Sequence, residues 1–226
     1  MPEWLTYSLR DFLMFGPDVY WRLYELHNLA IWPLPLFSLL AGILVLLLLT
    51  SRHHSATRLA CCVTALSWLG ASCFLAIHYA PINWPVGYAI WLFPAQTVLM
   101  IVAAVYHDAR PPSQARRPSR IAGWSLLVLA VLLYPILGSV FGRDLAQAQT
   151  FGIAPDPTAV ASLGLIELVK AGRWILPLSI IPVSWCLFSG VTLMTLNAPE
   201  GWLLFSALGV WLASRLAAFR EPGTND

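Results

Sequence analysis

The feature that most constrains this chain is a series of apolar runs, each long enough for a helix to cross a lipid bilayer. A helix needs about 20 apolar residues to cross a hydrocarbon layer of roughly 30 Å, and runs of that length lie at 29–50, 59–79, 86–106, 121–141 and 174–196, with a shorter one at 202–219. Hydrophobic residues make up 58% of the chain and charged residues only 11%, so a soluble core could not bury the apolar surface. The sequence therefore predicts an all-α polytopic membrane protein.

The segment at 157–171 is apolar but short, and the distribution of Lys and Arg decides whether it crosses, because these residues collect in cytoplasmic loops. If the segment does not cross, the 13 Lys and Arg residues divide almost evenly between the two sides of the membrane, six against seven. If it crosses, only Arg10, Arg22 and Arg143 lie on one side, and the other side holds Arg52, Arg58, Arg110, Arg116, Arg117, Arg120, Lys170, Arg173, Arg215 and Arg220. The sequence therefore predicts about seven transmembrane helices, with the N-terminus outside and the C-terminus cytoplasmic.

The whole chain, 1–226, is predicted to be a single integral membrane domain. Residues 1–15 carry apolar residues at helical spacing and are predicted to form an amphipathic helix at the outer interface. The helix that begins near Pro17 is expected to project from the membrane before Pro33 and Pro35 bend it. The predicted spans lie at about 17–50, 57–79, 86–106, 121–141, 157–171, 174–196 and 201–219.

The short span at 157–171 contains a carboxylate, Glu167. Asp156 is a candidate N-cap of this helix, with Pro157 at the first helical position. A lone charge in lipid costs several kcal/mol, so Glu167 is expected to face the bundle and to be either protonated or paired. One partner within reach along the helix is Lys170, three residues further on.

Polar residues of the types that bind ligands gather at helix ends that this topology places on the outer face. The candidate ligand-binding residues are His27, Asn28, His78, Asn83, Asp156 and Thr158, with Glu167 deeper in the membrane. His27, His78 and Asp156 are also candidate metal ligands, because imidazole suits ions such as Zn, Cu and Ni. Each side chain can instead cap a helix or satisfy a backbone group, and the sequence leaves both roles open.

Two adjacent cysteines, Cys61 and Cys62, also admit two interpretations. Buried cysteine commonly acts as a small hydrophobic residue, whereas a thiolate pair can bind a soft ion such as Hg(II) or Cu(I). The chain contains no CxxC motif, which argues against a zinc knuckle or a thioredoxin-type site.

No common catalytic motif is present. The chain contains no Walker loop, dinucleotide fingerprint, HExxH, GxSxG or EF-hand pattern, which disfavours ATP-driven transport by this chain alone and common hydrolase chemistry. No catalytic residue or cofactor is assigned, and enzymatic activity is less expected than binding or transport. The net charge of +2 gives no indication of nucleic acid. The expected partners are membrane lipids and either a second copy or a subunit of a membrane complex.

A set of residues distributed over nearly the whole chain resembles a known family. These residues are Phe15, Pro17, Tyr20, Tyr24, Asn28, Trp32, Pro33, Trp68, Gly70, His78, Ile82, Asn83, Gln96, Tyr134, Pro135, the segment FGIAPDPT at 151–158, Gly164, Pro182 and Trp185. In them the chain resembles an uncharacterised bacterial multi-pass inner-membrane family, a domain of unknown function. The resemblance implies the bacterial inner (plasma) membrane as the location, but it implies no activity.

Two functional hypotheses from different classes follow. The first is a module that binds or transports a small solute or metal ion at a site open to the outer face. The alternative is an accessory or assembly subunit of a larger membrane complex. A membrane enzyme acting on a lipid or quinone, with His78 as acid or base, ranks last, because no nucleophile–base pair is identifiable.

Overall fold

The computed structural model describes residues 10, 13–106, 111–169 and 172–220, and all regular secondary structure in these ranges is helical. In chain order the elements are α1 (Pro17–Ala30), α2 (Leu34–Thr50), α3 (His54–Phe74) with the π-helix η3 (Leu75–Tyr79), α4 (Val86–Tyr106), η4 (Pro112–Gln114), α5 (Arg117–Val128), the π-helix η5 (Leu129–Leu133), α6 (Tyr134–Val140), η6 (Leu145–Gln147), α7 (Pro155–Leu168), η7 (Gly172–Trp174), α8 (Ile175–Thr195) and α9 (Gly201–Arg220). The prediction of an all-α chain is thus confirmed for the described residues.

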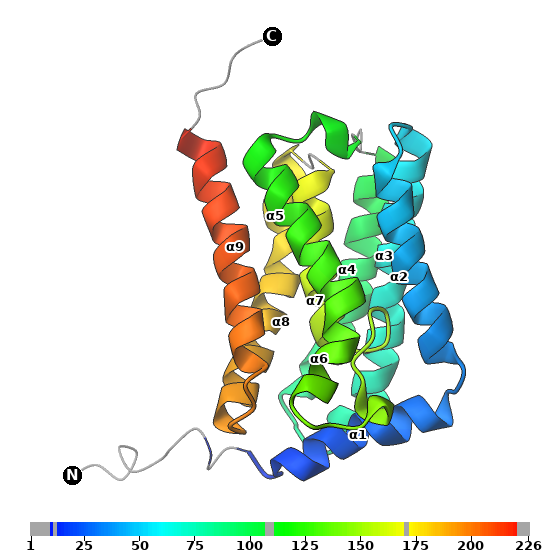
Figure 1. Cartoon of the computed structure of the whole chain (residues 1–226), viewed down its shortest axis with the longest axis vertical. Helices are drawn as coiled ribbons and strands as arrows, with labels where there is room; N and C mark the ends of the chain where they lie inside the picture. The colour runs from blue at the N-terminus through cyan, green and yellow to red at the C-terminus, as the bar shows by residue number, and fades with distance from the viewer. Residues whose placement is uncertain (1–9, 11–12, 107–110, 170–171, 221–226) are drawn as a thin grey trace, which may run out of the picture.

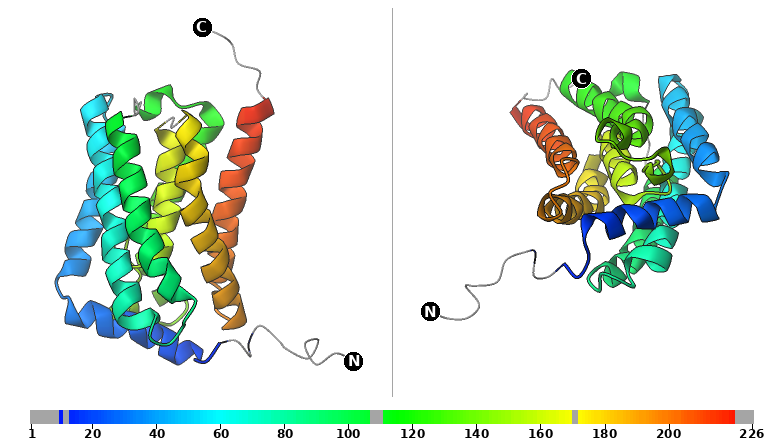
Figure 2. Two further views of the ribbon diagram at one scale, coloured as in Figure 1. Left: turned by 180° about the vertical axis from the view of Figure 1, so that it is seen from behind. Right: turned by 60° about the horizontal axis from the view of Figure 1, so that its bottom comes forward.

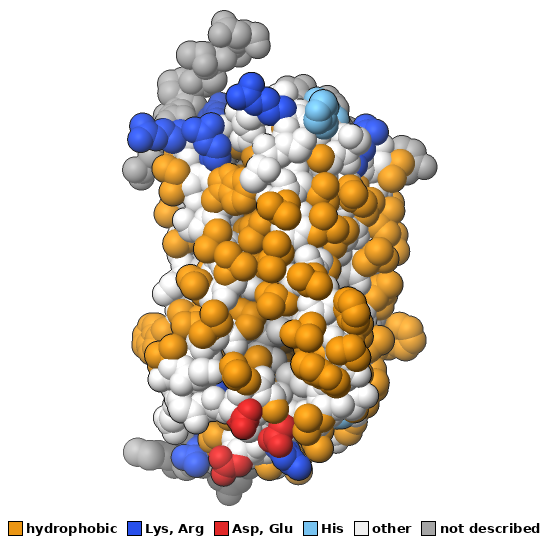
Figure 3. Space-filling view, turned by 45° about the vertical axis from the view of Figure 1, so that its right-hand side comes forward, with side chains coloured by type: hydrophobic (Ala, Val, Ile, Leu, Met, Phe, Trp, Pro, Cys, Tyr) orange, Lys and Arg blue, Asp and Glu red, His pale blue; other side chains and the backbone are white. Residues whose placement is uncertain are grey.

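The long helices run side by side along one axis, and α1 lies across one end of the bundle (Figure 1). We call this the α1 end. The opposite end, where α5 begins and α9 ends, is the arginine end. In the space-filling view, Lys and Arg gather at the arginine end, Asp and Glu lie at the α1 end, and hydrophobic side chains cover the surface between them (Figure 3). This banded surface is typical of a protein whose middle lies in lipid.

Within the described residues, five helices are long and apolar enough to cross a membrane, and they lie at His54–Tyr79, Val86–Val105, Arg117–Val140, Ile175–Thr195 and Gly201–Ala218. The pair α1 and α2 passes the same test together but is bent by 93°. These helices are those of a membrane protein, although they do not amount to the seven transmembrane helices that the sequence predicts.

The first predicted span, 17–50, differs from the expectation in its outer part. The chain does bend beside Pro33, but α1 lies against the end of the bundle, where it contacts η6 and η3, and does not project away from it. The reason is its buried face, which carries Tyr20, Trp21, Tyr24 and His27. The helix predicted at 1–15 falls mostly on residues 1–9, 11 and 12, which lie outside the described residues.

The predicted span at 157–171 is the short helix α7. Its 14 residues rise about 21 Å, less than a hydrocarbon layer, and the remaining distance is covered by a loop at 141–154 that enters the bundle from the α1 end (Figures 1 and 2). The expected cap was wrong. Ala154 is the N-cap and Pro155 occupies the first turn, so Asp156 lies inside the helix and makes no cap hydrogen bond. Proline suits this position because its missing N–H has no partner there anyway.

Two prolines within long helices are accommodated by side chains from neighbouring helices. A proline cannot donate to the carbonyl four residues earlier, so Pro94 in α4 and Pro182 in α8 each leave one oxygen without its helical donor. The Ser72 hydroxyl donates to the Ile90 oxygen (3.0 Å), and the Gln96 amide donates to the Leu178 oxygen (2.8 Å). These bonds matter in lipid, where no water can replace a missing backbone partner.

Helix α7 lies at the centre of the bundle, packed against α3, α5, α8 and α9, and all of its residues are buried. Its close contact with α5 depends on Gly123 and Gly164. A Cβ at either glycine would lie 2.8 Å from the other's carbonyl oxygen, so only glycine permits this approach. A second glycine contact brings the loop still closer to α3, because a Cβ on Gly70 would lie 2.1 Å from the Gly152 oxygen.

Candidate functional site

The most unusual group in the bundle is the Asp156 carboxylate, which is fully buried in the first turn of α7. The Trp185 indole N–H donates to Oδ1 (2.8 Å), and the Tyr134 hydroxyl lies 3.5 Å from Oδ2. Ser189 contributes a further side-chain hydrogen bond. All three donors are uncharged, and no ion pair joins Asp156 to a cationic side chain in the described part of the chain. The site therefore presents a carboxylate stabilised by neutral donors and by the positive end of a helix dipole.

Tyrosines from three segments surround the approach to Asp156 from the α1 end. Tyr20 and Tyr24 project from α1 with their hydroxyl oxygens 3.2 Å apart. Tyr79 of η3 packs edge-to-face on Tyr20 with 5.6 Å between ring centroids, and Tyr134 begins α6. The Tyr134 hydroxyl is the one placed next to the carboxylate, 3.5 Å from Asp156 Oδ2. We refer to the four tyrosines as the tyrosine cluster.

Two of these tyrosines are positioned by π-helical turns. Tyr79 ends η3, and Tyr134 directly follows η5. A π turn adds a residue to the helical repeat and redirects the side chains after it. At η5 the cause is Pro135, since proline in an α-helix interior clashes with the preceding turn.

The loop at 141–154 is held in place by two of the predicted site residues. The Asn28 amide donates to the carbonyl oxygens of Ala146 (2.8 Å) and Ala148 (2.9 Å). The Thr158 hydroxyl accepts from the Gly152 N–H (2.8 Å) and donates to the Ala154 oxygen (2.7 Å). With these partners, Asn28 and Thr158 orient the backbone that leads to Asp156.

A partly buried ion pair lies beside Tyr134. Arg143 pairs with Glu200, and its guanidinium carbon lies 3.6 Å from the centroid of the Trp21 ring. Burial lowers the pKa of Arg143 from its ordinary value. A cavity of about 10 Å³ beneath the pair is lined by both residues, by Trp21 and by Tyr134, and has room for about one water molecule. Tyr134 therefore lies between this cavity, which Arg143 and Glu200 line, and the Asp156 carboxylate.

The two predicted histidines come together beside this site. His27 and His78 lie with ring centroids 4.9 Å apart, and His27 also packs on Phe74 at 5.3 Å. Asp156 does not complete a metal site with them, because no group of three His, Cys, Asp or Glu side chains in the described ranges is arranged to hold an ion. Asn83 forms a side-chain hydrogen bond with Tyr79 and so supports the tyrosine cluster.

Glu167 lies at the other end of α7, near the arginine end, and pairs with Arg215 of α9. The Ser214 hydroxyl donates to Glu167 Oε2 (2.7 Å), and Arg215 also donates to the Ser119 hydroxyl (2.8 Å). The partner expected from the sequence, Lys170, lies outside the described residues. Cys61 is buried, Cys62 is partly buried, and neither forms a disulfide in the described chain.

Comparison with protein families decides the family membership. A model of a family of unknown function, DUF6064, matches residues 17–222. The chain belongs to the DUF6064 family. The match begins at α1 and includes every element described above, from the tyrosine cluster to the Glu167–Arg215 pair. Comparison with curated proteins and with solved structures gives no match.

Several residues of this site were not among the predicted site residues: the four tyrosines of the cluster, Trp21, Trp185, Ser189, Arg143 and Glu200. Tyr134 and Trp185 lie within apolar runs, where a hydrogen-bond donor that faces the bundle needs a partner. That requirement was the signal available in the sequence, but it does not identify the partner. Arg143 and Glu200 belong to loops 57 positions apart in the sequence, so only the fold reveals their pairing.

Proposed function

We propose that this DUF6064 protein is a membrane transport module in which Asp156 binds a proton and exchanges it with the α1 end. The observation that carries the proposal is a fully buried carboxylate, in the first turn of a short central helix, whose hydrogen-bond donors in the described chain are uncharged. Short helices that end inside a membrane bundle commonly present their N-terminal ends to substrates and ions. An ionisable residue within such a bundle is a functional candidate on physical grounds.

The environment of Asp156 suits proton exchange because opposing effects act on its two charge states. Burial away from water disfavours the carboxylate and favours the neutral acid. Hydrogen bonds from Trp185 and Ser189 and the N-terminal end of α7 favour the carboxylate. A cationic side chain would hold the group ionised, and none in the described chain pairs with it.

The exchange route in this proposal runs through Tyr134 and the small cavity beneath Arg143 and Glu200. A tyrosine hydroxyl both donates and accepts, so it can pass a proton between one water molecule and Asp156. The cavity volume of about 10 Å³ suits a proton or a single water better than a larger solute. The proposal takes the α1 end as the outer face, in keeping with the positive charge at the other end.

The test is proton flux into liposomes that contain the purified protein and the pH indicator pyranine. A potassium gradient with valinomycin makes the interior negative and draws protons inward. We expect liposomes with wild-type protein to acidify faster than protein-free liposomes. We expect Asp156→Asn to reduce this added proton flux at least about tenfold, which corresponds to an activation free energy higher by about 1.4 kcal/mol or more.

Asp18→Asn is the matched control. Asp18 also follows a proline in the first turn of a helix, but its side chain is exposed, so the flux should be unchanged. The proposal fails if Asp156→Asn retains the wild-type flux, or if wild-type protein conducts no faster than empty liposomes.

A second candidate function is the accessory subunit of a membrane complex, and one observation favours it. In the 18-residue apolar stretch of α9, 22% of the residues are buried inside the bundle, whereas the corresponding share in the other four candidate spans is 39–50%. Exposed apolar residues on α9 include Leu212 and Leu216, which offer a face to a partner helix. Stoichiometric co-purification of a partner in mild detergent, lost when these two leucines are changed to serine, would favour this function over the first.

A further inference from the structure

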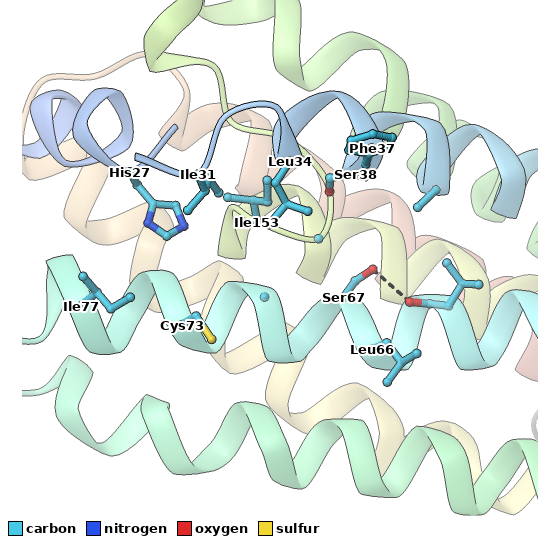
Figure 4. A pocket seen from close by; sticks show the side chains of 14 residues that line it. His27, Ile31, Leu34, Phe37, Ser38, Leu66, Ser67, Cys73, Ile77 and Ile153 are labelled. Atoms are coloured by element: carbon cyan, nitrogen blue, oxygen red, sulfur yellow. Dashed lines mark hydrogen bonds between the residues drawn. The ribbon is translucent and has the colours of Figure 1, made fainter. Parts of the chain in front are cut away.

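The largest cavity that we describe lies beside the bend between α1 and α2 and has a volume of about 590 Å³. The walls are α2 and α3, and the loop residues Gly152 and Ile153 form part of the lining (Figure 4). Its volume lies in the range of small-molecule sites, and its lining has their composition, with many apolar side chains and few polar ones. The cavity is separate from Asp156, which does not line it.

The cavity opens through the apolar side of the bundle. Three residues of its lining are also well exposed on the outer surface of the bundle: Phe37 at 61%, Leu66 at 57% and Ile77 at 60%. They belong to α2, α3 and η3, within the apolar helices of the bundle. A ligand dissolved in the bilayer would therefore enter sideways between α2 and α3.

One polar side chain at the α1 end of the cavity has no hydrogen-bond partner among the described residues. The His27 imidazole lines the cavity and points into it (Figure 4), and His27 is only 4% exposed. It makes ring contacts with Phe74 and His78, but no described residue hydrogen-bonds to either of its nitrogens. The hydroxyls of Ser38 and Ser67, by contrast, already donate to the carbonyl oxygens of Phe151 and Val63.

The charge state of His27 limits the ligand. Burial, with a smaller effect of His78, lowers its pKa to about 4, so the imidazole is neutral near pH 7. A neutral imidazole offers one donor and one acceptor but no positive charge to hold a carboxylate or a phosphate. The cavity thus combines a long apolar chamber with a neutral hydrogen-bonding group at one end.

We propose that this cavity binds a membrane amphiphile that has one long apolar chain and an uncharged carbonyl or hydroxyl head, with the head hydrogen-bonded to His27. The chain of the ligand lies along α2 and α3, where Phe37, Ala41 and Leu66 line the cavity. Prenyl quinones and fatty alcohols belong to this chemical class. The site is distinct from the carboxylate site and does not depend on proton transfer by Asp156.

The test uses decylubiquinone as the probe and protein in lipid nanodiscs, with empty nanodiscs as the reference for simple partitioning. We expect saturable binding of decylubiquinone above that reference and no competition from laurate, which pairs a similar chain with a charged head. His27→Phe keeps an aromatic ring but removes the hydrogen bond, and we expect it to weaken binding about tenfold. Ala41→Phe should abolish binding by filling the chamber.

Each variant has a matched control on an exposed site. His53→Phe repeats the His-to-Phe change at an exposed residue in the turn between α2 and α3. Ala213→Phe repeats the Ala-to-Phe change at an exposed residue of α9. Neither control variant should change the affinity for decylubiquinone. Absence of a saturable component in wild-type nanodiscs overturns the proposal. Equal competition by laurate, or full affinity in both His27→Phe and Ala41→Phe, also overturns it and leaves a groove filled by ordinary lipid.

Discussion

The two ends of α7 hold carboxylates in opposite ways. At the arginine end, Glu167 pairs with Arg215 and accepts from Ser214. At the other end, the donors to Asp156 in the described part of the chain are all neutral. Both residues are at most 2% exposed, so the difference does not come from burial. It comes from what the neighbouring helices supply.

This difference assigns separate roles to the two acids. An acid paired with arginine fastens α7 to α9, because separating the pair would leave a charge in a low-dielectric environment. An acid without a cationic partner can gain and lose a proton with little rearrangement of its surroundings. Three predictions test this contrast, from the largest expected effect to the smallest, and a fourth concerns the α1 end.

Removal of Arg215 should be the most destabilising single change. Arg215→Met leaves Glu167 buried without its cationic partner, and breaking such a pair costs about 3 kcal/mol in the free energy of unfolding. Adding Glu167→Gln to this variant should recover part of the loss. Denaturant unfolding in detergent measures the stability of both variants. The control is Arg22→Met, which breaks the exposed Arg22–Glu25 pair and should lower the free energy of unfolding by less than about 1 kcal/mol. Equal effects of the two arginine substitutions would contradict the role given to Glu167.

Gly164→Ala should disturb both ends of α7 together. The added Cβ would lie 2.8 Å from the Gly123 oxygen, so α5 and α7 must separate, at a cost of about 2 kcal/mol. Gly209→Ala in α9 is the control because a Cβ there meets no atom within 4 Å, and alanine should stabilise that helix slightly. Thermal unfolding that shows no difference between the two variants would show that α7 does not need this contact.

Asp156→Asn should change stability much less than the loss of Arg215. Asparagine keeps the size of the side chain and an oxygen that accepts a hydrogen bond, so we expect a cost of about 1 kcal/mol or less. The measurement is the same denaturant titration. A cost comparable to that of Arg215→Met would show that Asp156 is a structural anchor like Glu167, and the contrast between the two ends would disappear.

The α1 end should also respond to acid through His27. Its folded pKa of about 4 lies below the ordinary value of about 6.5, so between these pH values the unfolded chain binds more protons than the folded one. Stability is therefore full above about pH 6.5 and falls as the pH drops toward 4. The unfolding temperature of His27→Phe should depend less on pH across this window than that of the wild type or of His53→Phe. An unchanged pH dependence in His27→Phe would contradict the prediction.

Parts of this architecture follow from local sequence and parts do not. The apolar runs at 86–106 and 174–196 coincide within one residue with α4 and α8, because hydropathy is a property of each run by itself. The span predicted at 157–171 is only a short helix, since the segment before it, 141–154, extends as a loop into the bundle. The cap expected at Asp156 failed for a related reason, because Pro155 already begins the helix.

The candidate site shows the same division. Asp156, Glu167, His27 and His78 stand out in the sequence as polar groups near or within apolar segments. Their partners do not, because the segments that pack together are far apart along the chain. The contact between Asp156 and Trp185 joins positions 29 residues apart, and that between Glu167 and Arg215 joins positions 48 apart.

By itself the sequence determined the helical class, the approximate positions of the long apolar helices and the concentration of Arg near one end of the bundle. These depend on composition within each segment and on the energetics of apolar surface in lipid, which are local and additive. Only the tertiary structure decided that α1 lies across the bundle, that a loop completes the passage of α7, and that one acid of α7 has a cationic partner while the other has none among the described residues. Those outcomes depend on which side chains meet after packing, and a carboxylate's role follows from the group that lies beside it.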